Sequence, residues 1–140
     1  MAVLDLRKRK DAHAAQRLSD ELIVWLTTVS RQGQPRSSPV WFWWDGNVFH
    51  LFSQPRKPKL RNISANPLVS LHLEGGREGD DIVVFEGRAR IVSDGEPATS
   101  LPAYVEKYER LIGGYGWTSE SFAADYAVPI VVRPTRVRIS

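Results

Sequence analysis

The stretch Ser53–Leu73, SQPRKPKLRNISANPLVSLHL, lies between two runs that have the composition of β-strands. Proline is preorganised for the first position of an α-helix, and Pro58 stands early in this stretch. Two apolar residues after it, Leu60 and Ile63, are spaced to share one helical face. The Asn-Pro pair that follows ends the helix, because the residue before a proline is pushed out of the α region. The stretch therefore predicts a strand, a basic loop, a short helix and a second strand.

Four basic side chains gather at the start of the predicted helix: Arg56, Lys57, Lys59 and Arg61. The amides of a helix N-terminus, together with guanidinium and ammonium groups, form an anion site that is best suited to phosphate or carboxylate. The alternative is a solvated basic loop, since runs of charge are usually exposed surface. Composition alone leaves both interpretations open.

The totals of the chain are those of one ordinary domain. Its 140 residues are 42% hydrophobic, so we expect a single domain over 1–140 with a flexible segment at 1–10. The net charge of +3 is too mild to indicate nucleic acid. Because there is no cysteine, the chain has no disulfide framework, thiolate metal site or thiol nucleophile. No apolar run approaches the ~20 residues of a membrane span, and the N-terminus lacks the apolar core of a secretory signal. We therefore expect a cytoplasmic protein with no membrane partner.

Strand signals recur along the chain and are separated by turns and brief helices. Gly87 inside the longest predicted strand suggests a bulge or a sharp bend, and Pro39 inside the second suggests an edge or an interrupted ladder. Asp45-Gly46 is a hairpin signal. The predicted strands are 22–30, 36–44, 48–53, 68–74, 82–92 and 129–139. The predicted helices are 11–21, the short helix from Pro58, 101–112 ending before two glycines, and a short one that Thr118 or Ser119 caps.

Six strands separated by short turns predict a mainly β protein, an antiparallel barrel, rather than a layered α/β fold. Two segments of these strands, 40–44 and 82–85, are apolar on both faces. A barrel strand needs only one apolar face, so the second face predicts a homodimer that packs barrel on barrel. The alternative is that the helices alone cover these faces.

No catalytic constellation of side chains stands out. His13, His50 and His72 are scattered and lack the spacing of metal ligands, so we expect no metal site. The sequence has neither a nucleophile elbow nor a Gly-rich phosphate loop. If the protein is an enzyme, a cofactor carries the reaction. The basic loop is then the expected binding site for an anionic cofactor.

Three segments together resemble the pyridoxamine-phosphate-oxidase-like split β-barrel family. They are GQPRSSPVWFWWDGNVFHLFS at 33–53, KPKLRNISANPLVSLHLEG at 57–75 and VVFEGRARIV at 83–92. The most specific part is Lys59 ahead of the Asn-Pro pair, with Glu-Gly-Arg-Ala one strand later. The resemblance runs from about Leu22 to Val92 and is strongest to the branch of probable coenzyme F420-dependent oxidoreductases.

The resemblance implies a six-stranded split barrel and a homodimer with two cofactor sites at its interface. It implies that Lys59 binds the cofactor phosphate, and that Lys57 and Arg61 correspond to basic positions of the deazaflavin-binding members. Arg56 extends this cluster. FMN oxidases of the family have an arginine just before the phosphate-binding lysine, whereas this chain has Pro58, which favours coenzyme F420 over FMN. The strand that lines the flavin or deazaflavin ring corresponds to Ser37, Ser38, Pro39, Val40 and Trp41.

The resemblance and the chemistry of the basic loop agree. Coenzyme F420 carries a phosphodiester and an oligoglutamate tail, and several flexible cations suit such an extended polyanion. Its ring needs a dry apolar wall. Candidates for parts of this wall are Trp25, Trp41, Trp43 and Trp117, with core or dimer packing as the alternative for at least two of them.

We therefore expect an F420H2-dependent reductase that passes a hydride to a small electron-poor acceptor, such as a quinone, an enone or a nitro compound. The alternatives are an FMN-dependent oxidoreductase of the same fold and a non-catalytic binder of a flavin, a deazaflavin or a tetrapyrrole. Nucleic-acid binding is disfavoured, because the sequence has no identified nucleic-acid module. The sequence does not encode the substrate, whose pocket is expected to include loops such as 74–81 and 113–118.

Overall fold

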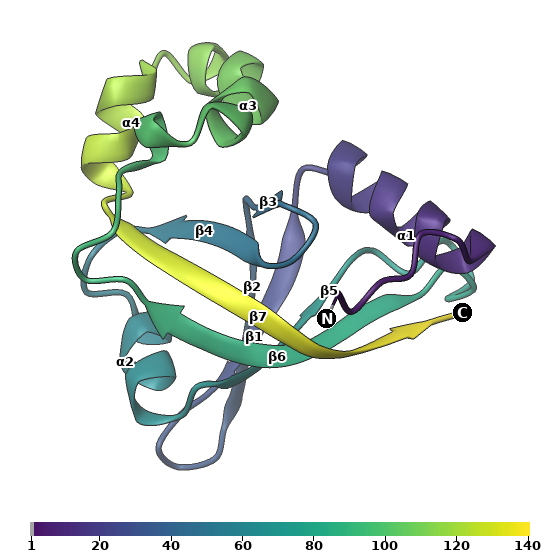
Figure 1. Cartoon of the computed structure of the whole chain (residues 1–140). Helices are drawn as coiled ribbons and strands as arrows, with labels where there is room; N and C mark the ends of the chain where they lie inside the picture. The colour runs from purple at the N-terminus through teal and green to yellow at the C-terminus, as the bar shows by residue number, and fades with distance from the viewer. Residues whose placement is uncertain (1) are drawn as a thin grey trace.

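One antiparallel β-sheet curls into a half-barrel with helices at its rims (Figure 1). The computed structural model describes residues 2–140. Neighbouring strands follow the order β2-β1-β5-β6-β7-β4-β3. The strands are β1 Val24–Val29, β2 Pro35–Val40, β3 Trp43–Trp44, β4 Phe49–Ser53, β5 Leu68–His72, β6 Val83–Ile91 and β7 Val128–Ile139. The helices are α1 Arg9–Asp20, α2 Pro58–Ala65, α3 Pro102–Gly114 and α4 Ser119–Asp125, with a short 3-10 helix, η1, at Ala98–Ser100.

The described residues form seven strands, not the six that the sequence predicts. The prediction of one strand over 36–44 is wrong, because this segment divides into β2 and β3, which stand at opposite ends of the sheet order. The division falls at Trp41 and Phe42. The amide and the carbonyl oxygen of Phe42 lie 2.8 and 2.9 Å from the hydroxyl of Tyr108 on α3, where a strand would offer them backbone partners. A distant side chain thus lies at the point where the strand divides, and the local pattern of 36–44 contains no sign of it.

The predicted irregularity at Gly87 is confirmed as a bulge. The register between β6 and β7 shifts between Glu86 and Gly87. A Cβ atom on Gly87 would lie 2.6 Å from the carbonyl oxygen of Arg133, so this close approach of the two backbones requires glycine. Bulges increase the local bend and twist of a strand pair. The shift therefore helps the longest pair of strands to curl around the core.

The interior of the half-barrel is one apolar cluster. Buried and half-buried positions alternate along β1, as expected for a strand with one face on a core. Phe42, Phe49 and Phe85 are fully buried at its centre. The ring centroids of Phe42 and Phe49 are 5.9 Å apart, and those of Phe49 and Phe85 are 5.1 Å apart. Aromatic side chains of this size bury a large apolar area per residue, so this trio contributes strongly to the core of the barrel.

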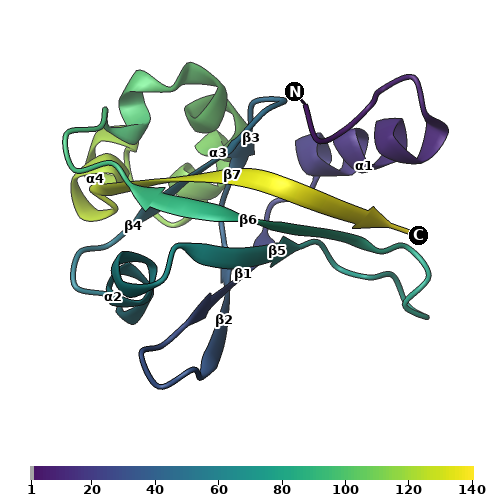
Figure 2. The ribbon, with the colours of Figure 1, turned by 60° about the horizontal axis from the view of Figure 1, so that its bottom comes forward.

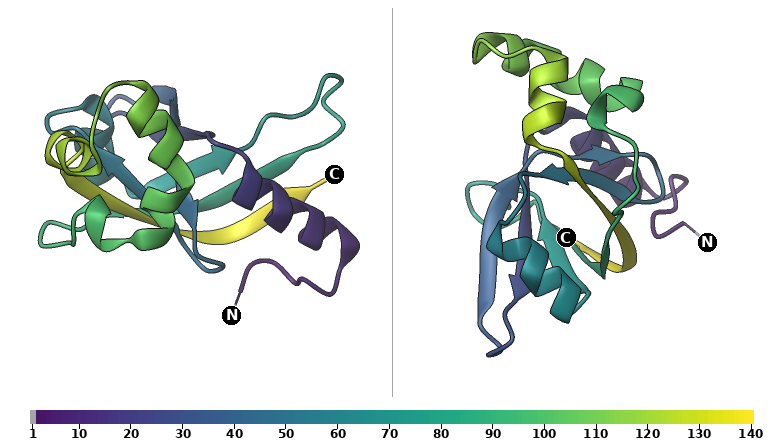
Figure 3. Two further views of the ribbon diagram at one scale, coloured as in Figure 1. Left: turned by 90° about the horizontal axis from the view of Figure 1, so that it is seen from above. Right: turned by 90° about the vertical axis from the view of Figure 1, so that its left-hand side faces the viewer.

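A second apolar cluster lies apart from the barrel, between η1, α3 and α4, and is built around Tyr104 and Tyr108. Figures 2 and 3 show these helices gathered at one end of the sheet, with α1 at the other end. The whole helical segment lies between β6 and β7 in the sequence. It leaves and rejoins the sheet at one place, where the amide of Val92 donates to the carbonyl oxygen of Pro129 at 3.0 Å.

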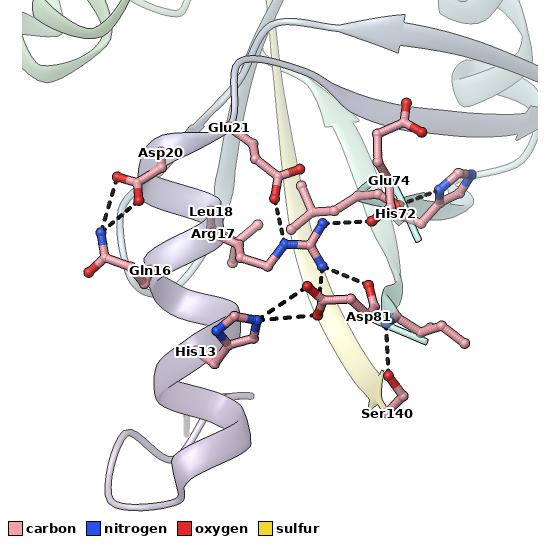
Figure 4. Close-up of polar contacts among 12 residues, drawn as sticks. His13, Gln16, Arg17, Leu18, Asp20, Glu21, His72, Glu74, Asp81 and Ser140 are labelled. Carbon is pink, nitrogen blue, oxygen red and sulfur yellow. Dashed lines mark hydrogen bonds and ion pairs between the residues drawn. The ribbon is translucent and has the colours of Figure 1, made fainter. Parts of the chain in front are cut away.

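Arg17 ties α1 to the loop 75–81 at the far end of the sheet (Figure 4). Its side chain is only 12% exposed. It donates to the carbonyl oxygens of Glu74 and Asp81 at 2.6 and 2.7 Å, and it pairs with the carboxylates of Glu21 and Asp81. One largely covered guanidinium therefore bonds to backbone groups of a loop that has no strand partners within residues 2–140.

The helix ends differ little from the predicted ones. α1 begins two residues before the predicted Asp11, and α3 includes Gly113 and Gly114 as its last two residues. The predicted cap of α4 is confirmed, because the hydroxyl of Thr118 accepts from the amide of Ser121 at 3.0 Å in a capping box.

Ahead of α1, the segment 1–10 that the sequence predicts to be flexible includes Met1, which lies outside the described residues. Leu4 in this segment is buried and packs against the half-barrel core. Among residues 2–140, no helix has both the length and the apolar character that a membrane crossing needs.

Candidate functional site

Two segments that are distant in the sequence meet at a hollow of about 340 Å³. Lys57 and Lys59, at the start of α2, form one side of it. Pro39, Val40 and Trp41, at the end of β2, form another. The hollow therefore brings together both predicted lysines and the predicted ring-wall residues from Pro39 onward. The remaining lining residues are Phe52, Ser53, Gln54, Tyr115, Trp117, Phe122 and Tyr126.

The start of α2 is built as the sequence predicts. Pro58 stands in the first turn, Lys57 is the N-cap residue, and no side chain caps the helix. The first amides of α2 therefore add a partial positive charge to that of the two lysines. Among residues 2–140, neither lysine has an ion-pair partner. The cationic corner of the hollow is thus not neutralised from within the described chain.

Lys59 is half-buried in this corner. Burial, and to a lesser extent the charge of Lys57, lowers the pKa of Lys59. Both causes penalise the charged ammonium. An anion bound between the two lysines would relieve both, because it supplies the missing opposite charge.

The opposite wall of the hollow is a stack of aromatic rings. The indole of Trp41 lies flat on Tyr108, with centroids 4.5 Å apart and planes 2° apart. On α4, Phe122 stacks against Trp41 at 5.5 Å and against Tyr126 at 4.8 Å. Stacked rings of this kind offer an apolar surface to a planar conjugated group. The hollow therefore combines a cationic corner with an aromatic wall.

The mouth of the hollow comes from the loop between α3 and α4. Tyr115 and Trp117 stack at 4.9 Å and are 63% and 38% exposed. This is the loop 113–118 that the sequence suggests for the substrate pocket. The other suggested loop, 74–81, lies at the opposite end of the sheet, where Arg17 holds it (Figure 4).

The part of the wall that α4 supplies is absent from the residues that the sequence predicts for the site. Phe122 and Tyr126 are four residues apart, which places them on one helical face. Together with Tyr115 and Trp117 they put four aromatic residues within 115–126. This density was the available signal, but it does not show that the segment folds back onto β2.

β2 is an edge strand, as Pro39 suggests, but its ladder with β1 is not interrupted. The register runs without a shift from Val40 opposite Val24 to Pro35 opposite Val29. Its other edge has no partner strand in the described sheet. Ser37 and Ser38 do not line the hollow, and the hydroxyl of Ser37 lies 2.7 Å from that of Thr27.

Two of the predicted basic residues lie away from the hollow. Arg56 is exposed, with a backbone φ of 64°. Arg61 lines a different, more open hollow of about 830 Å³, which it shares with Arg31 and Arg36 of the β1–β2 hairpin. Pro58 borders this second hollow, so the first turn of α2 separates the two.

The tryptophans divide between the hollow and packing elsewhere. Trp41 and Trp117 line the hollow. Trp25 stacks on His72 at 6.4 Å and donates to the carboxylate of Glu74, and Trp43 stacks on His50 at 4.9 Å. Two of the four, Trp25 and Trp43, therefore pack against neighbouring side chains outside the hollow, which agrees with the predicted alternative.

Histidines and carboxylates take no part in the hollow. His50 pairs with Asp45 at 2.8 Å, and His13 pairs with Asp81 at 3.2 Å on α1's side of the sheet. Over the described range 2–140, no three His, Asp or Glu residues are grouped closely enough to hold a metal ion. Within residues 2–140, the lining of the hollow therefore offers no imidazole or carboxylate for acid–base chemistry.

The family model for pyridoxamine 5'-phosphate oxidase matches residues 10–140, which include both sides of the hollow. The chain belongs to this family. A solved structure named F420 reductase is 31% identical to this pyridoxamine 5'-phosphate oxidase family member, with a TM-score of 0.67 over 88% of this chain and 94% of the other. A conserved hypothetical protein from Mycobacterium tuberculosis is 25% identical, with a TM-score of 0.71 over 91% and 81% of the two chains.

A putative pyridoxamine 5'-phosphate oxidase from Listeria innocua shares the fold at 20% identity, with a TM-score of 0.71 over 94% of this chain and 98% of the other. No curated protein matches the chain. The curled half-barrel is thus the fold of the pyridoxamine 5'-phosphate oxidase family, which includes oxidoreductases.

Proposed function

We propose that the protein is an oxidoreductase that binds coenzyme F420H2 in the hollow between β2, α2 and α4 and uses it to reduce a small organic acceptor. The observation that carries this proposal is that one hollow combines a stacked aromatic wall with two lysines that have no acidic partner within residues 2–140. The 31% identity to a structure named F420 reductase supports it.

The residues present fit the separate parts of this cofactor. Lys59 and Lys57 suit its phosphodiester, with the first amides of α2 behind them. Trp41 and Phe122 suit the planar ring and keep water from one of its faces. Arg61 lies beyond Pro58 on the far side of the helix turn, where only the extended tail would reach it. When bound, the deazaflavin supplies the hydride.

Among the described residues 2–140, those that line the hollow include no carboxylate and no histidine. A proton for the reduced acceptor would therefore come from solvent or from a hydroxyl such as that of Tyr115 or Tyr126, which line the same hollow. Tyr115 at the exposed mouth has the freer access to water. The chain's own contribution is to bind and orient the two reactants.

Titration of the purified protein with coenzyme F420 and with FMN, read by fluorescence, tests the proposal. We expect saturable binding of F420 that is tighter than that of FMN, and oxidation of F420H2 when a quinone such as menadione is added. Tighter binding of FMN, with a yellow protein after purification, would replace the proposal by an FMN-dependent oxidoreductase. Tight F420 binding without turnover of any quinone, enone or nitro compound would indicate a non-catalytic binder.

We also propose that two copies form a homodimer through the outer face of β1, β2 and β5. The register places nine side chains on this face, and none of them carries a formal charge: Trp25, Thr27, Val29, Pro35, Ser37, Pro39, Leu68, Ser70 and His72. Charged side chains, Glu86 and Arg88, begin on the neighbouring strand β6. Depletion of charge at the centre with a charged rim is typical of protein interfaces.

Light scattering at micromolar concentration is expected to give twice the chain mass of 15.8 kDa. Thr27→Arg, which places a charge at the centre of the neutral face, should shift the protein toward the monomer. Arg88→Glu on the rim is the matched control and should leave the mass unchanged. A wild-type mass of 15.8 kDa would remove the proposed dimer.

A further inference from the structure

Two neighbouring residues of α3, Lys107 and Tyr108, contact the backbone of Phe42, the residue that follows the ring-wall segment. The hydroxyl of Tyr108 accepts from the amide of Phe42 at 2.8 Å, and it faces the carbonyl oxygens of Leu22 and Phe42 at 2.7 and 2.9 Å. The ammonium of Lys107 donates to the carbonyl oxygens of Phe42 and Leu18 at 3.0 and 3.3 Å. Both backbone groups of Phe42 therefore have side-chain partners from α3.

No other group of the described chain bonds to the amide and the carbonyl oxygen of Phe42 if these side-chain partners are removed. Phe42 is 0% exposed, so water does not reach its backbone groups freely. A buried amide or carbonyl that loses its only partner costs about 1–3 kcal/mol. The contacts occur in the two-residue gap between β2 and β3, where no strand offers an alternative.

The same two residues also contact the rings of this segment. Tyr108 carries the indole of Trp41 flat on its ring, at 4.5 Å. The ammonium of Lys107 lies 3.6 Å from the centroid of the Phe42 ring, a cation–π contact. Lys107 also borders a separate hollow of about 430 Å³, together with Trp43 and Trp44.

We propose that Lys107 and Tyr108 are positioning residues of the candidate cofactor site: their polar groups hold the backbone N–H and C=O of Phe42 so that β2 ends at Val40 and the Trp41 indole stays in the wall of the hollow. The cofactor part of this inference rests on the proposed function. The positioning of Trp41 by Lys107 and Tyr108 is independent of it, because it is a property of the ligand-free protein.

A purely structural role would need only the bulk of the two side chains. Phenylalanine has the ring of tyrosine, and methionine has most of the stem of lysine, so hydrophobic packing survives both exchanges. Only the hydroxyl and the ammonium reach the backbone of Phe42. Variants that delete these two groups and keep the bulk therefore separate positioning from packing.

Hydrogen exchange of the Phe42 amide in the ligand-free protein is the first test. Tyr108→Phe should speed this exchange by about tenfold or more, because the amide loses its only side-chain acceptor. Fluorescence of Trp41, taken as the difference from a Trp41→Phe variant, should change with it. Glu109→Gln, an exposed change on the same helix, should alter neither. Unchanged exchange of Phe42 in Tyr108→Phe would overturn the proposal.

The pH profile of the Trp41 fluorescence is the second test, and it does not depend on Tyr108→Phe folding. Burial lowers the pKa of Lys107 to about 8, against the opposing effect of Asp20, the last residue of α1, and Glu21, its C-cap residue. A neutral amine is a weaker donor than an ammonium, so the hold on Phe42 weakens as the pH rises through this value. We expect a fluorescence transition with a midpoint near pH 8 in the wild type.

Lys107→Arg should abolish this transition, because a guanidinium stays charged over the whole range. The other titratable groups nearby are Glu106, which lines the same hollow, and His50, which stacks on Trp43 and pairs with Asp45. Glu106→Gln and His50→Gln should therefore retain it. A transition that persists in Lys107→Arg, or that is absent from the wild type, would contradict the assignment of Lys107.

Coenzyme F420 adds a readout that distinguishes this inference from the proposed function. If the wild type binds F420, Tyr108→Phe should weaken binding about threefold to tenfold, since the ring wall is less well ordered. Unchanged affinity alongside faster Phe42 exchange would overturn the cofactor part of the inference. If the wild type does not bind F420, the proposed function fails, and the ligand-free exchange and fluorescence still decide the hold on Trp41.

Discussion

Lys59→Ala is expected to weaken the binding of coenzyme F420 by about tenfold to a hundredfold. The lysine lines the hollow at the start of α2, where its ammonium would make a charge-assisted contact with the phosphodiester. Such a contact contributes roughly 1.5–3 kcal/mol. Lys59 is half-buried, and burial lowers its pKa. A bound anion would therefore stabilise an ammonium that has lost part of its hydration. Fluorescence titration at low salt measures the loss.

Lys57→Ala and Arg61→Ala are the comparison variants. Each should cost less than Lys59→Ala, because both cations are exposed and an extended anionic tail can exchange one cation for another. Both should also reduce the dependence of binding on salt, since exposed charges are screened. Circular dichroism should show an intact fold in all three. Equal F420 affinity in the wild type and in folded Lys59→Ala would restore the interpretation of a solvated basic loop.

Arg17→Met is expected to lower the free energy of unfolding by about 2–4 kcal/mol. The change keeps an apolar stem on α1 and removes the guanidinium that bonds the carbonyl oxygens of Glu74 and Asp81 and pairs with Glu21. The loop 75–81 would lose its main attachment to the helix. Urea denaturation followed by circular dichroism measures the change.

Arg9→Met on the exposed start of the same helix is the matched control for Arg17→Met. Surface substitutions of this kind usually change stability by less than about 0.5 kcal/mol. A loss in Arg9→Met as large as that in Arg17→Met would show that net charge, and not the buried contacts, determines the effect. F420 binding should survive Arg17→Met in the folded protein, because the hollow lies at the other end of the sheet.

Local signals in the sequence were enough to predict the elements that a nearby residue determines. Pro58 fixes the start of α2, Gly87 marks the bulge, and Thr118 caps α4, each through its own backbone preference. The division of 36–44 into two strands has a distant cause, because Tyr108 lies 66 residues after Phe42 and competes for its backbone groups. No periodicity within the segment records such a contact.

The candidate site shows the same division. Lys57 and Lys59 could be named because charge and a helix start coincide in one short stretch. The positions of the tryptophans, in the hollow or in packing elsewhere, could not be predicted. Side chains of a strand alternate between two faces, and the face that each one takes depends on the register with the neighbouring strands. Trp25 stands opposite Pro39 in that register and points outward with it, whereas Trp41 lies past the end of β2 and stacks on Tyr108.

The hydrogen bond between Val92 and Pro129 joins the two ends of the helical segment between β6 and β7, so the chain leaves the sheet and returns to it at paired positions of these strands. An insertion or deletion within this helical segment leaves the two flanking strands in register, and lengthening a loop costs little closure entropy. The part of the aromatic wall that α4 supplies and the cationic corner thus belong to separate parts of the chain, of which the first can change while α2 stays the same. Replacing this helical segment by one of another length would change which molecules can enter the hollow through its mouth. It would leave α2 and its lysines in place.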